Sequence, residues 1–446
     1  MDKHVRSGLG GLGGGIAAIG ATALMSTTML TAPAAAQTAE ELKAQIDKLQ
    51  QQVDQLSQQQ VAAAPVQAVV GGDKPRTYKL PGTDTSLQFG GYVKGDLIYD
   101  VKSKNLDSFV VSQIPDDGST GDERDGHVRF HARQSRVWFK SWTPTDLGEV
   151  RTHIEGDFFG DGGNETFSNS TTLRLRHAYG TLGGLLVGQT WTNFMSLHSS
   201  VETIDFNGPT GSGFSRQGQI RYTFTPNPGL AVSVSAENPE SDGRDTADNR
   251  LDPSRGGIGI DHLPDFTAGV RFSGEMVTVS GAAVVRQIAV DDGAANDEET
   301  LGWGLRAGVS ANVAGGRGNL VANIHGGDGI GKYMLSSGLG AVLEADGDLE
   351  TVFQWGTIVG AGWRWTDYVR SSIGYGHVEI DDGDIAAADL PVRQQSLHAN
   401  IIWAPVPRVW IGIEGIWGRL TLDDAGPGND DENDAFRIQI GSRFSF

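Results

Sequence analysis

The sequence predicts an all-β fold, a 16-stranded antiparallel transmembrane β-barrel over residues 84–446, preceded by a short N-terminal periplasmic coiled-coil helix. Three observations predict this fold. Apolar and polar residues alternate with period 2 from Thr85 onward, short and long connections alternate along the same region, and the first residues have the features of an export signal. An even number of antiparallel strands with short turns at one end and long loops at the other is typical of outer-membrane barrels. A soluble β-sandwich or β-helix would also alternate, but it would not explain these three features together.

The composition excludes several other classes of protein. The chain has 446 residues, 63 Gly, no Cys and a formal net charge of −20. The absence of Cys excludes a disulfide-stapled scaffold. Past the N-terminus, no stretch of about 18 apolar residues predicts a membrane-spanning helix. The acidic balance, 55 Asp and Glu against 35 Lys and Arg, argues against nucleic acid as a partner.

Residues 1–36 are expected to be a secretory signal peptide. A basic start is followed by an apolar run from Leu9 to Leu30 and by Ala34–Ala36, which offers an A-x-A cleavage site. A G-x-G-x-x-G match at Gly8–Gly13 lies inside this segment with no strand before it, so it does not indicate a nucleotide site. We therefore expect an exported protein of the outer membrane of a Gram-negative bacterium.

The next segment, residues 37–60, is expected to form a helix with a heptad seam. Its apolar residues are spaced 4-3-4-3, as Leu42, Ile46, Leu49, Val53 and Leu56. This spacing favours a coiled coil that associates with other copies over an amphipathic helix lying on its own protein. The helix is short enough to be marginal alone, and the seam does not fix the number of copies. A linker, residues 61–83, is expected to join this helix, placed in the periplasm, to the barrel.

The first barrel strand allows its two faces to be assigned. Apolar residues such as Phe89, Val93 and Leu97 fall on one face, and polar residues such as Lys94 and Asp96 fall on the other. Hydrocarbon must meet the apolar face, and the sheet must close because an open edge cannot be hydrated in lipid. Tryptophans near strand ends are candidate interfacial residues, namely Trp303, Trp355, Trp363, Trp365, Trp403 and Trp417. Glycine falls mostly on the polar face or in turns, where we expect it to leave the lumen open.

The polar face carries arginine repeatedly, mainly on the early strands. The predicted pore-lining residues are Arg129, Arg133, Arg136, Arg151, His153, Arg174, Arg176 and Arg221. Within residues 128–142 the arginines change parity, which predicts a bulge that switches faces. A charged lining sets the selectivity of a pore, and the planar guanidinium can hold carboxylate or phosphate with two bonds. These arginines could instead only pair with neighbouring acids, but we favour an anion-attracting cluster.

The third long connection, residues 195–217, is predicted to narrow the pore. It has few charges and a bend at Pro209–Gly213. A 16-stranded barrel is wide enough to leave an aqueous channel, so a loop folded inward would set its narrowest point. Glu202, Asp205 and Arg216 would then face the arginines of the early strands. An ordinary surface loop is the alternative.

Enzymatic activity is not expected, since no G-x-S-x-G or H-E-x-x-H motif occurs and no Ser is specifically placed beside His153 and Asp157. No cofactor is expected. A metal site is not expected either, because the acidic loops do not meet the EF-hand spacing. A barrel whose helix only tethers the envelope is an alternative from another functional class.

Several segments together resemble the DcaP-like trimeric outer-membrane porins and, more loosely, the phosphate-selective and general porins. They are GGYVKGDLIYD (90–100), RQSRVWFKSWTPTDLGEVRTHIEGDFFG (133–160), LRLRHAYGTLGGLLVGQTWTNFM (173–195) and ETIDFNGP (202–209). The resemblance implies a homotrimer in contact with outer-membrane lipid and lipopolysaccharide, and uptake of small anionic solutes such as dicarboxylates. Phosphate or polyphosphate remains the alternative substrate. Trp138 departs from the smaller residue that is usual in related SRxGFK segments.

Overall fold

The computed structural model describes residues 39–62, 70–115, 125–160, 162–163, 165–246, 249–293, 297–335, 339–381, 390–423 and 432–446. The expected signal peptide, residues 1–36, lies outside the described residues. The chain divides into two compact units, Met1–Ala68 and Val69–Phe446.

Among its described residues, the first unit contains one helix, α1 (Ala39–Ala62). Glu40 and Glu41 lie in its first turn, where negative charge interacts favourably with the helix dipole. The five heptad residues are all exposed, with fractional exposures from 48% at Leu42 to 63% at Leu56. None of the described helices has the length and apolar character needed to cross a membrane.

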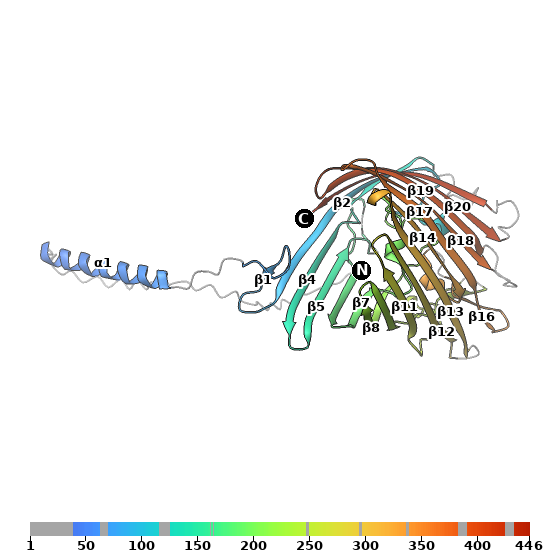
Figure 1. The fold of residues 1–446 in the computed structure, drawn as a ribbon, viewed down its shortest axis with the longest axis horizontal. Helices are drawn as coiled ribbons and strands as arrows, with labels where there is room; N and C mark the ends of the chain where they lie inside the picture. Colours follow the sequence, from blue (N-terminus) through green and yellow to red (C-terminus); the bar gives the residue numbers. More distant parts are fainter. Residues whose placement is uncertain are drawn as a thin grey trace, which may run out of the picture. The chain divides into compact units, whose positions relative to one another are not determined.

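The second unit is a closed antiparallel barrel of sixteen spans, in which β3 and β4 form one span and the two-residue β1 is an addition at one edge. Figure 1 shows the strands side by side around the barrel. The sheet closes because β2 pairs with β21, the last strand. The strands are β1 (Tyr78–Lys79), β2 (Ser86–Lys102), β3 (His127–His131), β4 (Arg136–Thr145), β5 (Gly148–Asp157), β6 (Arg174–Leu182), β7 (Leu185–Trp191), β8 (Arg216–Asn227), β9 (Leu230–Glu237), β11 (Asp265–Ser273), β12 (Val277–Asp291), β13 (Asp297–Val313), β14 (Gly318–Asp328), β17 (Phe353–Arg364), β18 (Val369–Asp381), β19 (Leu390–Val406), β20 (Val409–Asp423) and β21 (Glu432–Ser445).

The alternation of residues places the apolar face outward, as predicted. On β2, Phe89 is 61% exposed in the isolated chain, while Lys94 and Asp96 are each 1% exposed inside the barrel. A lipid-facing surface must be apolar, and every backbone group of the spans must bond to a neighbouring strand. The fold class predicted from the sequence is therefore confirmed.

The change of parity on the second span is also confirmed. β2 pairs with β3 at Asp96↔His131 and with β4 at Tyr92↔Arg136. Between these two pairs, three residues of β2 (93–95) oppose four of its partner (132–135), so one extra residue is inserted. Arg129 before the bulge and Arg136 after it both reach carboxylates inside the barrel.

The alternation of connections predicts long polar loops near residues 289–299, 379–393 and 419–433, and these three loops are shorter than predicted. Strands extend into the segments 289–299, 379–393 and 419–433, and β12 pairs with β13 as far as Asp291↔Asp297. Opposite charges sit directly across from each other in these extensions, as in Glu379↔Arg393 and Arg419↔Asp434. Such cross-strand pairs stabilise a hairpin beyond the membrane without an apolar face.

The remaining long connections form structure of their own. Two of them supply a three-stranded sheet of β10 (Gly243–Asp245), β15 (Ala341–Leu343) and β16 (Leu349–Thr351), in which β10 and β15 run parallel. A buried apolar cluster that includes Phe194, Tyr333 and Val342 joins these connections to the barrel wall. Short 3-10 helices punctuate the connections: η1 (Val111–Gln113), η2 (Leu197–Ser199), η3 (Pro253–Arg255), η4 (Ala314–Gly316) and η5 (Gly331–Tyr333).

The expected linker, residues 61–83, is only partly a linker. Residues 63–69 lie outside the described part of the chain, but from Val70 on the segment contacts the barrel. β1 pairs with the start of β2 at Tyr78↔Leu87, and Lys74 forms an ion pair with Glu149 of β5 at 2.9 Å. The barrel unit therefore begins before residue 84.

Candidate functional site: the pore and its inner loops

The connection between β7 and β8 runs along the inside of the barrel. Its backbone is anchored to three distant strands by side chains of the wall. Asn323 on β14 donates to the Ser199 carbonyl at 3.0 Å, Glu414 on β20 accepts from the Ile204 amide at 2.7 Å, and Ser396 on β19 accepts from the Thr210 amide at 2.9 Å. The segment 192–215, the inner loop, therefore crosses the lumen and returns.

Inward-facing glycines make room for this loop instead of leaving the lumen open as expected. A Cβ at Gly376 would lie 2.0 Å from the Thr210 carbonyl oxygen, and one at Gly360 would lie 2.4 Å from a methyl of Val201. On the loop itself, Gly211 has φ +80°, and a Cβ there would lie 2.4 Å from the His377 carbonyl oxygen. Side chains at these positions would push the loop away from the wall.

A second connection, residues 103–115, also folds inward, although the sequence indicated only a long polar loop. Its Val111 and Ile114 pack against Ile416 and Leu420 of β20. Asp205 of the inner loop accepts the Phe109 amide at 2.8 Å and so joins the two connections. Asp205 is 2% exposed, and burial raises its pKa above the usual value for an aspartate.

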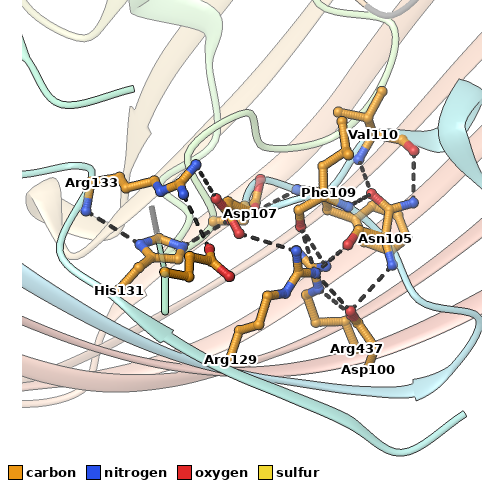
Figure 2. Close-up of polar contacts among 12 residues, drawn as sticks. Asp100, Asn105, Asp107, Phe109, Val110, Arg129, His131, Arg133 and Arg437 are labelled. Atoms are coloured by element: carbon orange, nitrogen blue, oxygen red, sulfur yellow. Dashed lines mark hydrogen bonds and ion pairs between the residues drawn. The ribbon is translucent and has the colours of Figure 1, made fainter. Parts of the chain in front are cut away.

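Figure 2 shows how the connection 103–115 contacts arginines of the barrel wall. Asp107 pairs with Arg129 at 3.1 Å and with Arg133 at 2.6 Å. Asp100 on β2 accepts from Arg129 at 3.0 Å and from Arg437 on β21 at 2.6 Å. Glu165 also pairs with Arg133, at 3.2 Å, so three carboxylates neutralise much of the charge of three guanidinium groups here.

Next to this network lies the arginine cluster, formed by Arg136, Arg174, Arg176 and Arg216 with the carboxylates of Glu155 and Asp157. Asp157 accepts from Arg174 at 2.9 Å and Arg176 at 2.7 Å, and Glu155 accepts from Arg176 at 2.8 Å and Arg136 at 3.2 Å.

Arg216 differs from the other three arginines of the cluster. Its guanidinium lies 4.8 Å from the Trp191 ring and 5.5 Å from the Phe214 ring, and its Nε and Nη1 have no hydrogen-bond partner among the described residues. The cluster as a whole holds four guanidinium groups against two carboxylates. Arg216 forms no ion pair with a described carboxylate, so its charge adds to the positive field of the cluster.

The remaining predicted pore-lining residues, Arg151, His153 and Arg221, lie in three different surroundings. Arg151 is at the rim, beside the short β4–β5 turn, and pairs with Glu149 at 2.7 Å. His153 stacks on His177 at a ring distance of 5.5 Å, and Arg221 donates to the Trp191 carbonyl.

Glu202 and Asp205 do not face the arginines of the early strands, where the sequence analysis expected them. Glu202 forms a bidentate pair with Arg370 on β18 at 2.7 and 2.8 Å, and the buried Asp205 accepts backbone amides instead. The inner loop is held against β14 and β17–β20, and the loop residue that does reach Arg174 and Arg176 is Phe206, whose ring lies 5.3 and 5.5 Å from their guanidinium groups.

Sequence reasoning missed the aromatic partners of Arg216. Trp191 ends β7 and Phe214 precedes β8, so both lie where a strand meets the loop. Alternation gives no face for such positions, and only the loop's path brings the two rings together. Arg271 was also missed, although the alternation of Phe266, Val270 and Phe272 outward on β11 could have placed it inward.

Comparison with known proteins agrees with this architecture. A sequence model of the DcaP outer membrane protein family matches residues 25–446. The chain belongs to this family. The outer membrane channel DcaP of Acinetobacter baumannii is 26% identical, and its structure superposes with a TM-score of 0.71 over 84% of this chain and 100% of that one. The anion-selective porin from Comamonas acidovorans, with 12% identity over 81% of this chain and 100% of that one and a TM-score of 0.50, shares the fold.

Curated relatives include two Brucella porins. Porin Omp2b of Brucella suis is 28% identical over 219 residues, and porin Omp2a of Brucella ovis is 27% identical over 221 residues. The alignments cover 46% of this chain and 52% and 56% of the two porins. The chain thus spans about half the length of the curated relatives it matches.

Proposed function

We propose that the chain is an outer-membrane porin through which small anions, such as dicarboxylates, diffuse passively. The observation that carries this proposal is the arginine cluster at the inner loop. Its four guanidinium groups outnumber its two carboxylates, and Arg216, which directly follows the inner loop, pairs with no described carboxylate. Membership of the DcaP family and the closed barrel support a channel in the outer membrane.

The selectivity follows from charge placed where the pore is narrow. A charged lining favours ions of the opposite sign, and its effect is strongest where an ion must approach the wall. Most of the predicted arginines are already paired, so the local excess at Arg216 matters more than the total count. The acidic net charge of −20 is no obstacle, because many of the acidic residues fall in the connections between the strands.

We further propose that the protein works as a homotrimer in outer-membrane lipid and lipopolysaccharide, with α1 in the periplasm. The exposed heptad seam supports association, because Ile46 is 50% and Val53 61% exposed in a single chain. β2 starts at the end of the barrel with the short turns, which is the periplasmic end of outer-membrane barrels.

The test is the reversal potential of the reconstituted full chain in a planar bilayer under a KCl gradient. An anion-selective sign supports the proposal, and a cation-selective sign or a closed barrel contradicts it. Arg216→Gln should lower the anion-to-cation permeability ratio about two- to fivefold, the effect of about 0.4–1 kcal/mol from one partly screened charge. Arg317→Gln, at an exposed turn residue, is the matched control and should leave the ratio unchanged.

A further inference from the structure

A basic cavity lies inside the barrel, separate from the arginine cluster. Its volume is about 320 Å³, and Arg221 on β8, Arg271 on β11 and Arg306 on β13 line it together with His198 of the inner loop. Among the described residues that line it, none is an Asp or a Glu. The cavity therefore gathers three guanidinium groups without a carboxylate.

Among the described residues, Arg221 and Arg306 bond to neutral groups and form no ion pair, Arg221 with the Trp191 carbonyl and Arg306 with Ser280. Arg306 is 7% exposed, its Nη1 donates to the Ser280 hydroxyl at 3.0 Å, and its Nε has no partner among the described residues. The Nε of Arg221 is likewise buried and unpaired. A buried guanidinium without a counter-charge is costly, so an anion that entered the cavity would be stabilised.

The inner-loop histidine and the hydroxyl groups complete the lining. His198 Nε2 lies 2.8 Å from the Ser280 hydroxyl, and its Nδ1 is unpaired. Burial and the neighbouring Arg306 and Arg271 lower the pKa of His198, as expected where positive charge is not balanced. Glu237 lies behind this wall, where it is 1% exposed and accepts hydrogen bonds from Gln217, Ser235 and Thr267.

The cavity lies nearer the short-turn end of the barrel than the arginine cluster does. Arg221 follows Arg216 by five residues on β8, a distance of about 17 Å along a strand. Arg271 and Ser280 flank the short turn between β11 and β12. An anion that has passed Arg216 toward the short-turn end would therefore meet this cavity next.

We infer that this cavity is a second anion site, which binds small oxyanions (carboxylates or inorganic phosphate) on the short-turn side of the inner loop. The inference rests on the proposed function in that the oxyanion reaches the site through the pore. It adds a separate binding step, with its own residues, to the passage past Arg216.

The experiment measures block of single channels of the full chain by oxyanions. Potassium succinate or potassium phosphate is titrated into either chamber of a planar bilayer in KCl, and the half-blocking concentration is determined. The double variant Arg271→Gln/Arg306→Gln should raise the half-blocking concentration about tenfold, as expected when charge-assisted hydrogen bonds are lost. The control Arg317→Gln/Arg408→Gln removes the same charge from exposed short turns and should change it less than about twofold.

The outcomes distinguish binding in this cavity from a general effect of positive charge on the pore. An equal effect of both double variants, or no effect of the cavity variant, would overturn the inference. Block by both anions supports a general oxyanion site, and block by one alone narrows it to carboxylates or to phosphate. The single variant Arg271→Gln, at an exposed rim residue, tests the same point if the double variant does not assemble.

The proposed function fails independently of this inference. If Arg216→Gln leaves the reversal potential unchanged while the cavity variant weakens block, the role of the arginine cluster is wrong and the second site stands. If Arg216→Gln shifts the reversal potential and the cavity variant changes nothing, the second site is wrong and the proposed function stands.

Discussion

Ion pairing decides how much of the wall's positive charge a passing anion meets. Asp107 serves both Arg129 and Arg133, and Asp157 serves both Arg174 and Arg176. Two guanidinium groups that share one carboxylate carry a net charge of about +1 between them, less than one positive charge for each arginine. Removing an acid should therefore change the field in the pore as strongly as removing an arginine, but with the opposite sign.

Asp107→Asn tests this point. The change leaves Arg129 with Asp100 and Arg133 with only Glu165, at 3.2 Å, so the net positive charge at the connection 103–115 rises. We expect the anion-to-cation permeability ratio to increase about two- to fivefold, again the effect of about 0.4–1 kcal/mol from one charge. The reversal potential under a KCl gradient measures it, with Asp367→Asn in a short turn as the control. A fall in the ratio would show that Asp107 does not act through the pore's field.

The direction of these side chains could be predicted from sequence, but their partners could not. Period-2 alternation indicates that Arg129, Arg136 and Arg176 face the lumen, because hydrocarbon must meet the other face. Which acid each one meets depends on strand register and on connections such as 103–115, whose Asp107 comes from outside the spans. Arg216 shows the same limit, since its aromatic partners lie at two strand ends.

At the scale of elements, the backbone of the inner loop is held by polar side chains, among them two buried acids, Glu414 of β20 and Asp205 of the loop itself. Asp205 accepts the amides of Phe109, Asn207 and Gly208 at 2.8, 2.8 and 3.2 Å. The sequence predicted an inward loop from its position and its few charges. It did not predict that the loop packs against the glycines of β17 and β18, because a glycine on an inward face is equally compatible with open space.

Asp205 should make the loop's motion depend on pH. Burial raises the pKa of Asp205 in the closed arrangement, so this arrangement binds a proton more readily than one in which the loop has left the wall. The closed loop is then most favoured below the ordinary aspartate pKa of about 3.9 and becomes less favoured as pH rises through the raised value. We expect open-channel current noise to decrease on acidification from pH 7 toward pH 4, and Asp205→Asn to remove most of this change. Noise that increases on acidification in the parent but not in Asp205→Asn would reverse the sign of this argument.

Shortening the inner loop should widen the pore. Removing Asn207–Gly213 deletes the contacts of Thr210 with Ser396 and of Gly211 with the wall, while the barrel's own pairing is untouched. Since a 16-stranded barrel is wide enough for an aqueous channel, we expect a higher single-channel conductance and weaker discrimination among anions. Conductance equal to that of the parent, measured on assemblies of confirmed size, would contradict the constriction.

At the scale of the whole molecule, the two units have different sources of stability. The barrel closes on itself through β2 and β21, so every span has two hydrogen-bonded neighbours. The helix α1 leaves its entire apolar seam exposed in one chain. A short helix of this kind is marginal alone, so its order depends on burying the seam against other copies.

Deletion of residues 37–68 tests this division. The cut leaves Val70 onward in place, and with it the pairing of β1 with β2 and the Lys74–Glu149 ion pair. We expect a barrel that still conducts with unchanged selectivity, because no span and no residue of the arginine cluster is lost. We also expect the oligomer to dissociate at a lower temperature in mild detergent, because tethered helices add to association by raising their effective concentration. Ile46→Asn/Val53→Asn keeps the length of the helix, so the same loss of heat resistance in this variant assigns the effect to the apolar seam. A truncated chain that gives only monomers would show instead that the helix is needed for assembly, and an unchanged dissociation temperature in both variants would show that the seam does not associate.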